Sequence, residues 1–169
     1  KAVLFSGTVE DNVFFGQSAA EKTDASLQAA LSLSQAAEFV NKYPEKAAHP
    51  IAQLGRNVSG GQKQRLSIAR ALARTPEILI FDDSFSALDY KTDATLREGL
   101  AKELPGTTKI IVAQRISTIR NADQILVLDR GEIAGLGTHD ALMASCTVYR
   151  EIAMSQLSEE ELKKGGASK

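Results

Sequence analysis

The chain contains the run Ile78-Leu79-Ile80-Phe81-Asp82-Asp83, and this stretch decides the fold class. Four consecutive apolar side chains are typical of a strand that is buried on both faces. A similar run, Lys109-Ile110-Ile111-Val112-Ala113, leads to Gln114, and the segment from about Thr92 to Leu104 between the two runs favours a helix. This strand–helix–strand order predicts an α/β fold with two parallel strands and a right-handed crossover.

Polar side chains follow both predicted strands. Asp82 and Asp83 come directly after the first strand, and Gln114 follows the second. Because ligand groups gather beyond the C-terminal ends of parallel strands, we expect these three side chains to share one crevice. Carboxylates in such a place suit a hard cation such as Mg²⁺, which binds one or two carboxylates together with phosphate oxygens.

A glycine-rich turn upstream of these strands has the features of an anion site. Ser59-Gly60-Gly61-Gln62 opens a predicted helix that continues to Arg74, and Pro76 follows it. Backbone N–H groups and the helix dipole at such a start favour an anion such as phosphate. The same residues also fit a plain turn and helix N-cap, so the turn alone leaves both interpretations open.

The residues before this turn predict two further elements. Ala2-Val3-Leu4-Phe5 is typical of a strand end without a turn or cap before it, so we expect the chain to begin inside a longer pattern. Apolar side chains at helical spacing from Ala25 to Tyr43 predict one amphipathic helix, which Pro44 ends.

The C-terminal third predicts a hairpin followed by helices. Ile125–Leu128 and Glu132–Ala134 flank Asp129-Arg130-Gly131, which is typical of a glycine-bearing hairpin turn. Thr138 is expected to start a helix near Ala141. Ser158-Glu159-Glu160-Glu161 has the pattern of a capping box, which predicts a short charged helix in the tail.

The charge balance argues against nucleic acid as a partner. The chain has 20 basic and 21 acidic residues and a net charge of −1, so no strong overall field would recruit a polyanion. A basic cluster does occur on the helix after the glycine-rich turn. We expect it to be a solvated helix face, formed by Lys63, Arg65, Arg70 and Arg74.

Taken together, several stretches in a fixed order resemble the nucleotide-binding domain of ATP-binding-cassette (ABC) transporters. Residues 57–65 are similar to the family's signature motif, and residues 78–82 to its Walker B strand. The D-loop, the switch strand and the closing segment follow at the family's spacing, in residues 86–89, 111–115 and 127–139. Residues 4–13 resemble the stretch that follows the Q-loop in ABC exporters.

The resemblance implies specific roles for these residues. Two nucleotide-binding domains of this family close head to tail around ATP, so the signature residues would contact the ATP that the partner's Walker A motif holds. Asp82 would position Mg²⁺. The residues that the resemblance places at the nucleotide are Ser59, Gly60, Gly61, Gln62 and Asp89.

Two positions depart from the family's catalytic pattern. Asp83 stands where the family usually has a glutamate that orients the attacking water, and a displacement of ~1 Å at such a group can lower a rate by on the order of a hundredfold. Gln114 stands where the family usually has a histidine, so it offers a hydrogen bond but no positive charge. Gln53-Leu54-Gly55 also differs from the Glu-Arg-Gly of many exporters.

The resemblance does not include the N-terminal third of the family's nucleotide-binding domain. The 169 residues contain no G-x-x-x-x-G-K-[ST] loop and no Q-loop glutamine, so we expect a partial P-loop ATPase core without its Walker A portion. Such a chain is expected to bind ATP very weakly when alone, to hydrolyse none, and to self-associate through uncovered sheet edges.

These expectations combine into one hypothesis. The chain would comprise a post-Q-loop segment (1–20), a helical subdomain (21–57), the signature helix with the C-terminal half of the ATPase core (58–157), and a charged tail (158–169). It would be the catalytically degenerate half of a heterodimeric exporter, joined to transmembrane domains at the cytoplasmic face of the plasma membrane, with ATP and Mg²⁺ as cofactors. The alternatives are a non-transport ABC ATPase that acts on nucleic acid or ribosomes, and a non-catalytic regulatory module.

Overall fold

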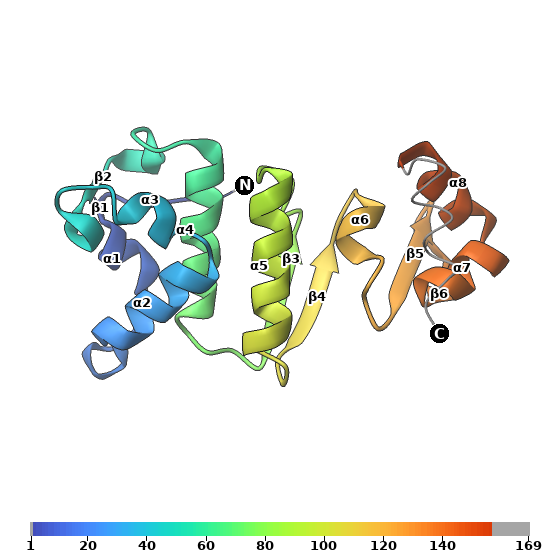
Figure 1. Cartoon of the computed structure of the whole chain (residues 1–169), viewed down its shortest axis with the longest axis horizontal. Coiled ribbons are helices and arrows are strands. Elements are labelled where there is room, and N and C mark those ends of the chain that lie inside the picture. Colours follow the sequence, from blue (N-terminus) through green and yellow to red (C-terminus); the bar gives the residue numbers. More distant parts are fainter. Residues whose placement is uncertain (1, 157–169) are drawn as a thin grey trace. The chain divides into compact units, whose positions relative to one another are not determined.

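The computed structural model describes residues 2–156, which divide into two compact units (Figure 1). Unit 1 ends at Val112 and unit 2 starts at Ala113. The elements of unit 1 are β1 (Gly7–Thr8), α1 (Val9–Val13), η1 (Ala19–Glu21), α2 (Asp24–Leu33), α3 (Ala37–Val40), η2 (Lys46–Ala48), β2 (Pro50–Ile51), η3 (Gln53–Gly55), α4 (Gly60–Leu72), β3 (Ile78–Asp82), α5 (Tyr90–Glu103) and β4 (Thr108–Val112). Unit 2 contains α6 (Ile116–Ile119), β5 (Ile125–Asp129), β6 (Glu132–Gly137), α7 (His139–Ser145) and α8 (Thr147–Gln156).

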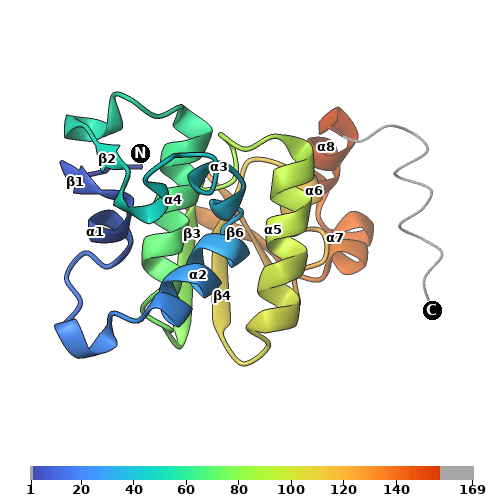
Figure 2. The same cartoon turned by 60° about the vertical axis from the view of Figure 1, so that its left-hand side comes forward.

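The predicted parallel pair is confirmed. Strand β3 pairs with β4 in parallel, in a register that runs from Ile78 opposite Thr108 to Asp82 opposite Val112. Helix α5 connects the two strands and lies along them in both views of the chain (Figures 1 and 2). The side chains of β3 that face this helix are buried in one cluster with Leu96 and Leu100 of α5.

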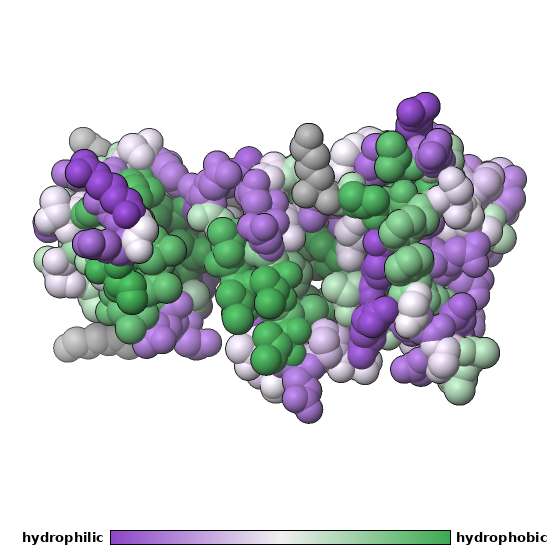
Figure 3. Space-filling model, turned by 180° about the vertical axis from the view of Figure 1, so that it is seen from behind, coloured by the Kyte–Doolittle hydropathy of each residue, from purple (hydrophilic) through white to green (hydrophobic). Residues whose placement is uncertain are grey.

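The expectation that both faces of these strands are buried is wrong for the described residues. Burial alternates along β3, because α5 covers only one face of the pair. The opposite face carries apolar side chains that are 48–67% exposed, and Figure 3 shows apolar residues gathered over this part of the surface. These side chains are Ile78, Ile80, Ile110 and Val112.

The single helix predicted from Ala25 to Tyr43 is also wrong, because the chain forms two helices with a break between them. Gln35, at the break, adopts a left-handed backbone with φ of 60°. The hydroxyl of Ser34 donates to the carbonyl of Leu31 at 3.1 Å and accepts from the Ala36 N–H at 3.4 Å. Such local side-chain bonds offer the backbone an alternative to helical bonding, so the break has an identifiable cause.

Residues 2–5 do not form the predicted strand. Phe5 instead exchanges two hydrogen bonds with the side chain of Asn12: its N–H donates to Oδ1 and its carbonyl accepts from Nδ2, each at 2.9 Å. Asn12 is 1% exposed, and its Nδ2 also donates to the Thr8 carbonyl at 2.9 Å. The buried side-chain amide of Asn12 therefore satisfies the backbone of Phe5, as a neighbouring strand would in a sheet.

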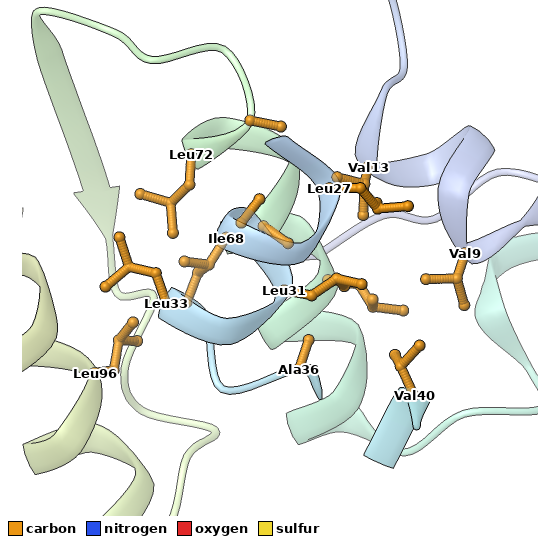
Figure 4. Packing of buried hydrophobic residues seen from close by; sticks show 14 of the residues in the cluster. Val9, Val13, Leu27, Leu31, Leu33, Ala36, Val40, Ile68, Leu72 and Leu96 are labelled. Carbon is orange, nitrogen blue, oxygen red and sulfur yellow. The ribbon is translucent and has the colours of Figure 1, made fainter. Parts of the chain in front are cut away.

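The core of unit 1 gathers around α4. Figure 4 shows side chains of α1, α2, α4 and α5 meeting in one cluster, and Leu33 of α2 lies opposite Leu96 of α5. The two helices approach closely here, since a Cβ built at Gly99 would lie 2.8 Å from the Leu33 Cδ1. A glycine at position 99 thus lets α2 pack against the crossover helix of the sheet.

Unit 2 contains the predicted hairpin. Strands β5 and β6 pair antiparallel, and the turn residues Arg130 and Gly131 have φ of 50° and 86°, as a two-residue turn with both central residues left-handed requires. A register shift lies between Val127 and Leu128. The predicted start of the next helix is confirmed, because Thr138 caps α7 and accepts a hydrogen bond from the Ala141 N–H at 3.4 Å.

The helices of unit 2 cover one face of this hairpin. The chain's single cysteine, Cys146, is 5% exposed and its Sγ donates weakly to the Ala134 carbonyl at 3.6 Å. A Cβ built at Gly135 would lie 3.0 Å from this sulfur. The capping box predicted at residues 158–161 lies outside the described residues.

Within residues 2–156, no helix combines the length and the apolar character that a membrane span requires.

Candidate functional site

The glycine-rich turn forms the exposed N-terminal end of α4. Ser59 caps the helix: its Oγ accepts from the Gln62 N–H at 3.2 Å, and its own N–H donates to the Gln62 Oε1 at 2.8 Å. Gln62, one of the predicted nucleotide contacts, uses its side-chain oxygen in this reciprocal cap. The first amides of a helix point out of its N-terminus, so those of Gly60 and Gly61 face outward.

The two signature glycines differ in their surroundings. A Cβ built at Gly60 would meet no described atom within 4 Å, so this side of the turn is open to a ligand. A Cβ built at Gly61 would lie 3.2 Å from the carbonyl oxygen of Ala87. The fold therefore brings the signature turn against the loop that follows β3.

The predicted acidic pair lies at the C-terminal end of β3, with both side chains exposed. The N–H of Asp83 donates to the Val112 carbonyl at 3.0 Å, which extends the bonding to β4 by one residue. Its φ of 48° lies in the left-handed region, which aspartate adopts more readily than most residues with a Cβ. The loop after the pair is anchored by Phe85, which is buried with its ring centroid 5.0 Å from that of Phe81.

Asp89, another predicted nucleotide contact, caps α5. Its Oδ1 accepts from the Thr92 N–H at 3.0 Å and its Oδ2 accepts from the Thr92 hydroxyl at 2.7 Å. The bonds from the Thr92 hydroxyl and backbone lower the pKa of the Asp89 carboxyl below its ordinary value. Both carboxylate oxygens are thus used within the chain.

Gln114 belongs to unit 2, where its side chain is exposed. Its backbone carbonyl accepts from the Gln156 Nε2 at 2.8 Å, and the Gln156 Oε1 accepts from the Ile116 N–H at 2.9 Å. Gln156, at the end of α8, therefore holds the predicted switch segment from both sides of Arg115. The closeness of Gln114 to Asp82 and Asp83 stays a prediction.

Sequence reasoning missed the polar contacts that hold α4. The expected solvated face is wrong for Arg65 and Arg70, which are only partly exposed and bond within unit 1; Arg74 is exposed, although its guanidinium group also bonds within the unit. Arg70 donates from Nε to the Asn12 carbonyl at 2.7 Å, from Nη2 to the Asn12 Oδ1 at 2.9 Å, and from Nη1 to the Val3 carbonyl at 3.0 Å. Burial, and to a smaller extent the charge of Arg74, lowers the pKa of Arg70.

The other two arginines bond to the segments on either side. Arg65 donates from Nη1 to the Gln35 carbonyl at 3.0 Å and to Glu38 at 3.1 Å, and Arg74 donates to the Phe15 carbonyl at 2.8 Å. One sequence signal could have found this network. Asn12 occupies the same helical face as the buried Val9 and Val13, where an amide needs hydrogen-bonding partners.

Comparison with known proteins agrees with this geometry. Residues 2–86 match a family model described as ABC transporter. The chain is 43% identical over 162 residues to a putative ABC transporter ATP-binding protein of Mycoplasma pneumoniae, the MG014 homolog, and this match covers 91% of the chain and 26% of the relative. It is 41% identical over 154 residues to human ATP-binding cassette sub-family B member 5, with 91% of the chain and 12% of the relative covered.

A solved structure supports the same assignment. The structure of a bacterial Atm1-family ABC exporter with ATP bound matches with a TM-score of 0.87 and 35% identity, over 94% of this chain and 28% of that chain. The chain thus spans only part of these relatives: 26% of the Mycoplasma protein, 28% of the exporter chain and 12% of the human protein. The α/β fold expected from the sequence, part of an ABC-type ATPase core, is confirmed, and the chain belongs to the ABC transporter family.

Proposed function

We propose that this chain is the C-terminal part of the nucleotide-binding domain of an ABC exporter, which binds ATP with Mg²⁺ against a second such domain and couples its hydrolysis to transport. The observation that carries the proposal is the open N-terminal turn of α4. There, the cap formed by Ser59 and Gln62 leaves the backbone N–H groups of Gly60 and Gly61 facing outward, and the space beside Gly60 is unobstructed. The likeness to an exporter structure with ATP bound supports the same use of the turn.

In this proposal the chain contributes to two ATP sites. Ser59, Gly60 and Gly61 contact the γ-phosphate of ATP held by the partner domain, and they complete the partner's site. Asp82 positions Mg²⁺ in the chain's own site, where Asp83 orients water. A carboxylate one methylene shorter than glutamate and the uncharged Gln114 make this second site weak, so the transporter is a heterodimer with one competent site.

The contacts of α4 suit this role. Arg65, Arg70 and Arg74 fix the body of the helix against other segments of unit 1, and none of them lies in the first turn. The turn is therefore held in place by bonds that leave the N–H groups of Gly60 and Gly61 available to nucleotide, as a preorganised phosphate site requires. The nucleotide-binding domain would lie at the cytoplasmic face of the plasma membrane, attached to transmembrane domains.

Substitution of the open turn in the full-length heterodimer tests the proposal. Gly60→Asp places a carboxylate where the γ-phosphate would lie, and Ser59→Arg adds bulk there, so each is expected to lower ATP turnover by on the order of 10²-fold or more. Gly106→Asp is the matched control, because a Cβ at Gly106 meets no described atom within 4 Å and the residue lies between α5 and β4. Near-normal turnover of Gly60→Asp, while the partner's catalytic glutamate stays essential, would contradict the assignment.

The same assay separates the alternatives. A non-catalytic regulatory module has no turnover at its own site, so disabling that site changes nothing. The proposed heterodimer loses a weak residual turnover when this site is disabled and nearly all turnover when the partner's site is disabled. ATP-dependent uptake by inside-out vesicles that contain the heterodimer distinguishes an exporter from an ABC ATPase without transport activity.

A further inference from the structure

The two signature glycines occupy different environments. Gly60 and Gly61 are successive residues in the first turn of α4, and neither has a positive φ. A methyl group at Gly60 would enter open space, whereas one at Gly61 would lie 3.2 Å from the carbonyl oxygen of Ala87. A contact this short forces the neighbour to move by a few tenths of an ångström, and here the neighbour is backbone.

The loop that contains Ala87 is anchored on both sides of this contact. Before it, the Ser86 hydroxyl donates to the Asp83 carbonyl at 3.0 Å, and Phe85 is buried. After it, the buried Leu88 donates its N–H to the Phe85 carbonyl at 3.1 Å. The carbonyl of Ala87 therefore cannot retreat without disturbing residues 83–89 as a unit.

We propose that Gly61 is a positioning residue for the loop that carries Asp83, in addition to the phosphate contact that the proposed function gives its backbone. Because Gly61 has no Cβ, the first turn of α4 packs against the Ala87 carbonyl. This contact fixes the position of residues 83–89 relative to the C-terminal end of β3. The inference rests on the proposed function only for what residues 83–89 then do with nucleotide.

One consequence concerns communication between sites. The turn of α4 serves the partner's ATP, and Asp83 serves the chain's own ATP, so the contact between Gly61 and Ala87 joins groups that act at different nucleotides. Movement of the turn towards the partner's phosphate would relax the loop beside Asp83. The link is steric and lies entirely within unit 1.

Alanine substitutions at the two glycines form a matched pair. Both positions lie in the first turn of α4, so Gly60→Ala and Gly61→Ala gain the same helix propensity, and only the second meets the loop. Hydrogen-exchange mass spectrometry of the full-length heterodimer without nucleotide should show faster exchange in peptides that cover residues 83–92 in Gly61→Ala alone. Amide hydrogen exchange at Leu88 and Thr92 should be about tenfold faster in that variant.

The outcomes separate this inference from the proposed function, because no nucleotide is present. Changes confined to α4 in both variants would overturn the positioning role, whether or not the full-length protein hydrolyses ATP. If Gly61→Ala does not fold, the double variant Gly61→Ala/Ala87→Gly decides, since glycine at position 87 frees the backbone to turn its carbonyl away. If the double variant recovers native exchange rates outside residues 83–92, the contact between positions 61 and 87 is supported. If it does not recover them, the positioning role of Gly61 is overturned.

Discussion

The two units both bury polar contacts, but the chemistry of these contacts differs. In unit 1, guanidinium groups of α4 donate to amide and backbone oxygens, and Arg70 with Asn12 is the most buried example. In unit 2, the buried contact is a neutral pair in which the His139 Nδ1 and the Tyr149 hydroxyl lie 2.8 Å apart. The groups in unit 1 keep their charge across the physiological pH range, whereas histidine titrates near it. The Arg70 contacts that hold α4 are therefore insensitive to pH near neutrality, whereas the buried pair of unit 2 is not.

The largest expected effect tests whether the two units act together. Asp83→Glu in unit 1 and Gln114→His in unit 2 should together raise hydrolysis at the chain's own site by on the order of 10²–10³-fold, since water alignment and charge stabilisation act on one transition state. The double variant should exceed the sum of the two single effects. Single-turnover measurements with the partner's competent site disabled give the rates.

The geometry adds a stability cost to this experiment. Glutamate fits the left-handed backbone at position 83 less well than aspartate, so Asp83→Glu should also lower the melting temperature slightly. A double variant with an unchanged rate would show that these two residues do not silence the site.

The second prediction weakens the charged contacts of unit 1. Arg70→Ala removes three hydrogen bonds that a charged group donates, and it leaves the oxygens of Asn12 without their guanidinium donor. The free energy of unfolding should therefore fall by about 3 kcal/mol. Chemical denaturation of the chain measures this. Arg56→Ala is the control, because Arg56 is exposed and should change stability by less than about 0.5 kcal/mol. Equal effects of the two substitutions would show that the Arg70 contacts do not hold α4.

The third prediction compares the N-terminal cap of α4, Ser59, with the contacts that Arg70 makes further along the helix. Ser59→Ala removes the side-chain cap and should lower the free energy of unfolding by about 1 kcal/mol. Combined with Arg70→Ala, the effects should add, because the two residues share no hydrogen-bonding partner. If the two stability effects do not add, the Arg70 contacts also stabilise the turn that Ser59 caps.

The smallest effect concerns the neutral pair of unit 2. Burial, and next the charge of Arg120, lowers the pKa of His139 below its ordinary value of 6.5, although Asp140 opposes this. Below about pH 6.5 the unfolded chain then binds more protons than the folded one, so stability is lost as the pH falls towards the lowered pKa. The melting temperature should fall when the pH is lowered from 7.5 to 5.5, and this fall should be about 2 °C smaller in His139→Gln than in the unsubstituted chain. An unchanged pH dependence in this variant would remove His139 as its source.

The sequence predicted the parts of the fold that local patterns determine. The runs that became β3 and β4, the hairpin turn at Arg130 and Gly131, and the cap at Thr138 each depend on a few neighbouring residues. The break at Gln35 escaped prediction because apolar spacing continues across it, while its cause is a buried serine and a distant contact from Arg65.

The candidate site shows the same division. Residue types identified the turn at Ser59 and the carboxylates after β3, since their chemistry is carried by the side chains themselves. The different surroundings of Gly60 and Gly61 could not be predicted, because they depend on where α4 meets a loop 26 residues further along the chain. Glycines look alike in a sequence, and only packing distinguishes them.

The buried sulfur of Cys146 makes this chain convenient for site-specific labelling. It is the single cysteine in the sequence, and it lies beneath β6 with little exposure. A maleimide dye added to the native fold would therefore react slowly with it. Thiols introduced at exposed positions such as Lys102 in unit 1 and Glu132 in unit 2 would react first. A pair of spin labels or fluorophores attached to this chain in this way would report changes in the distance between the two units without prior removal of Cys146.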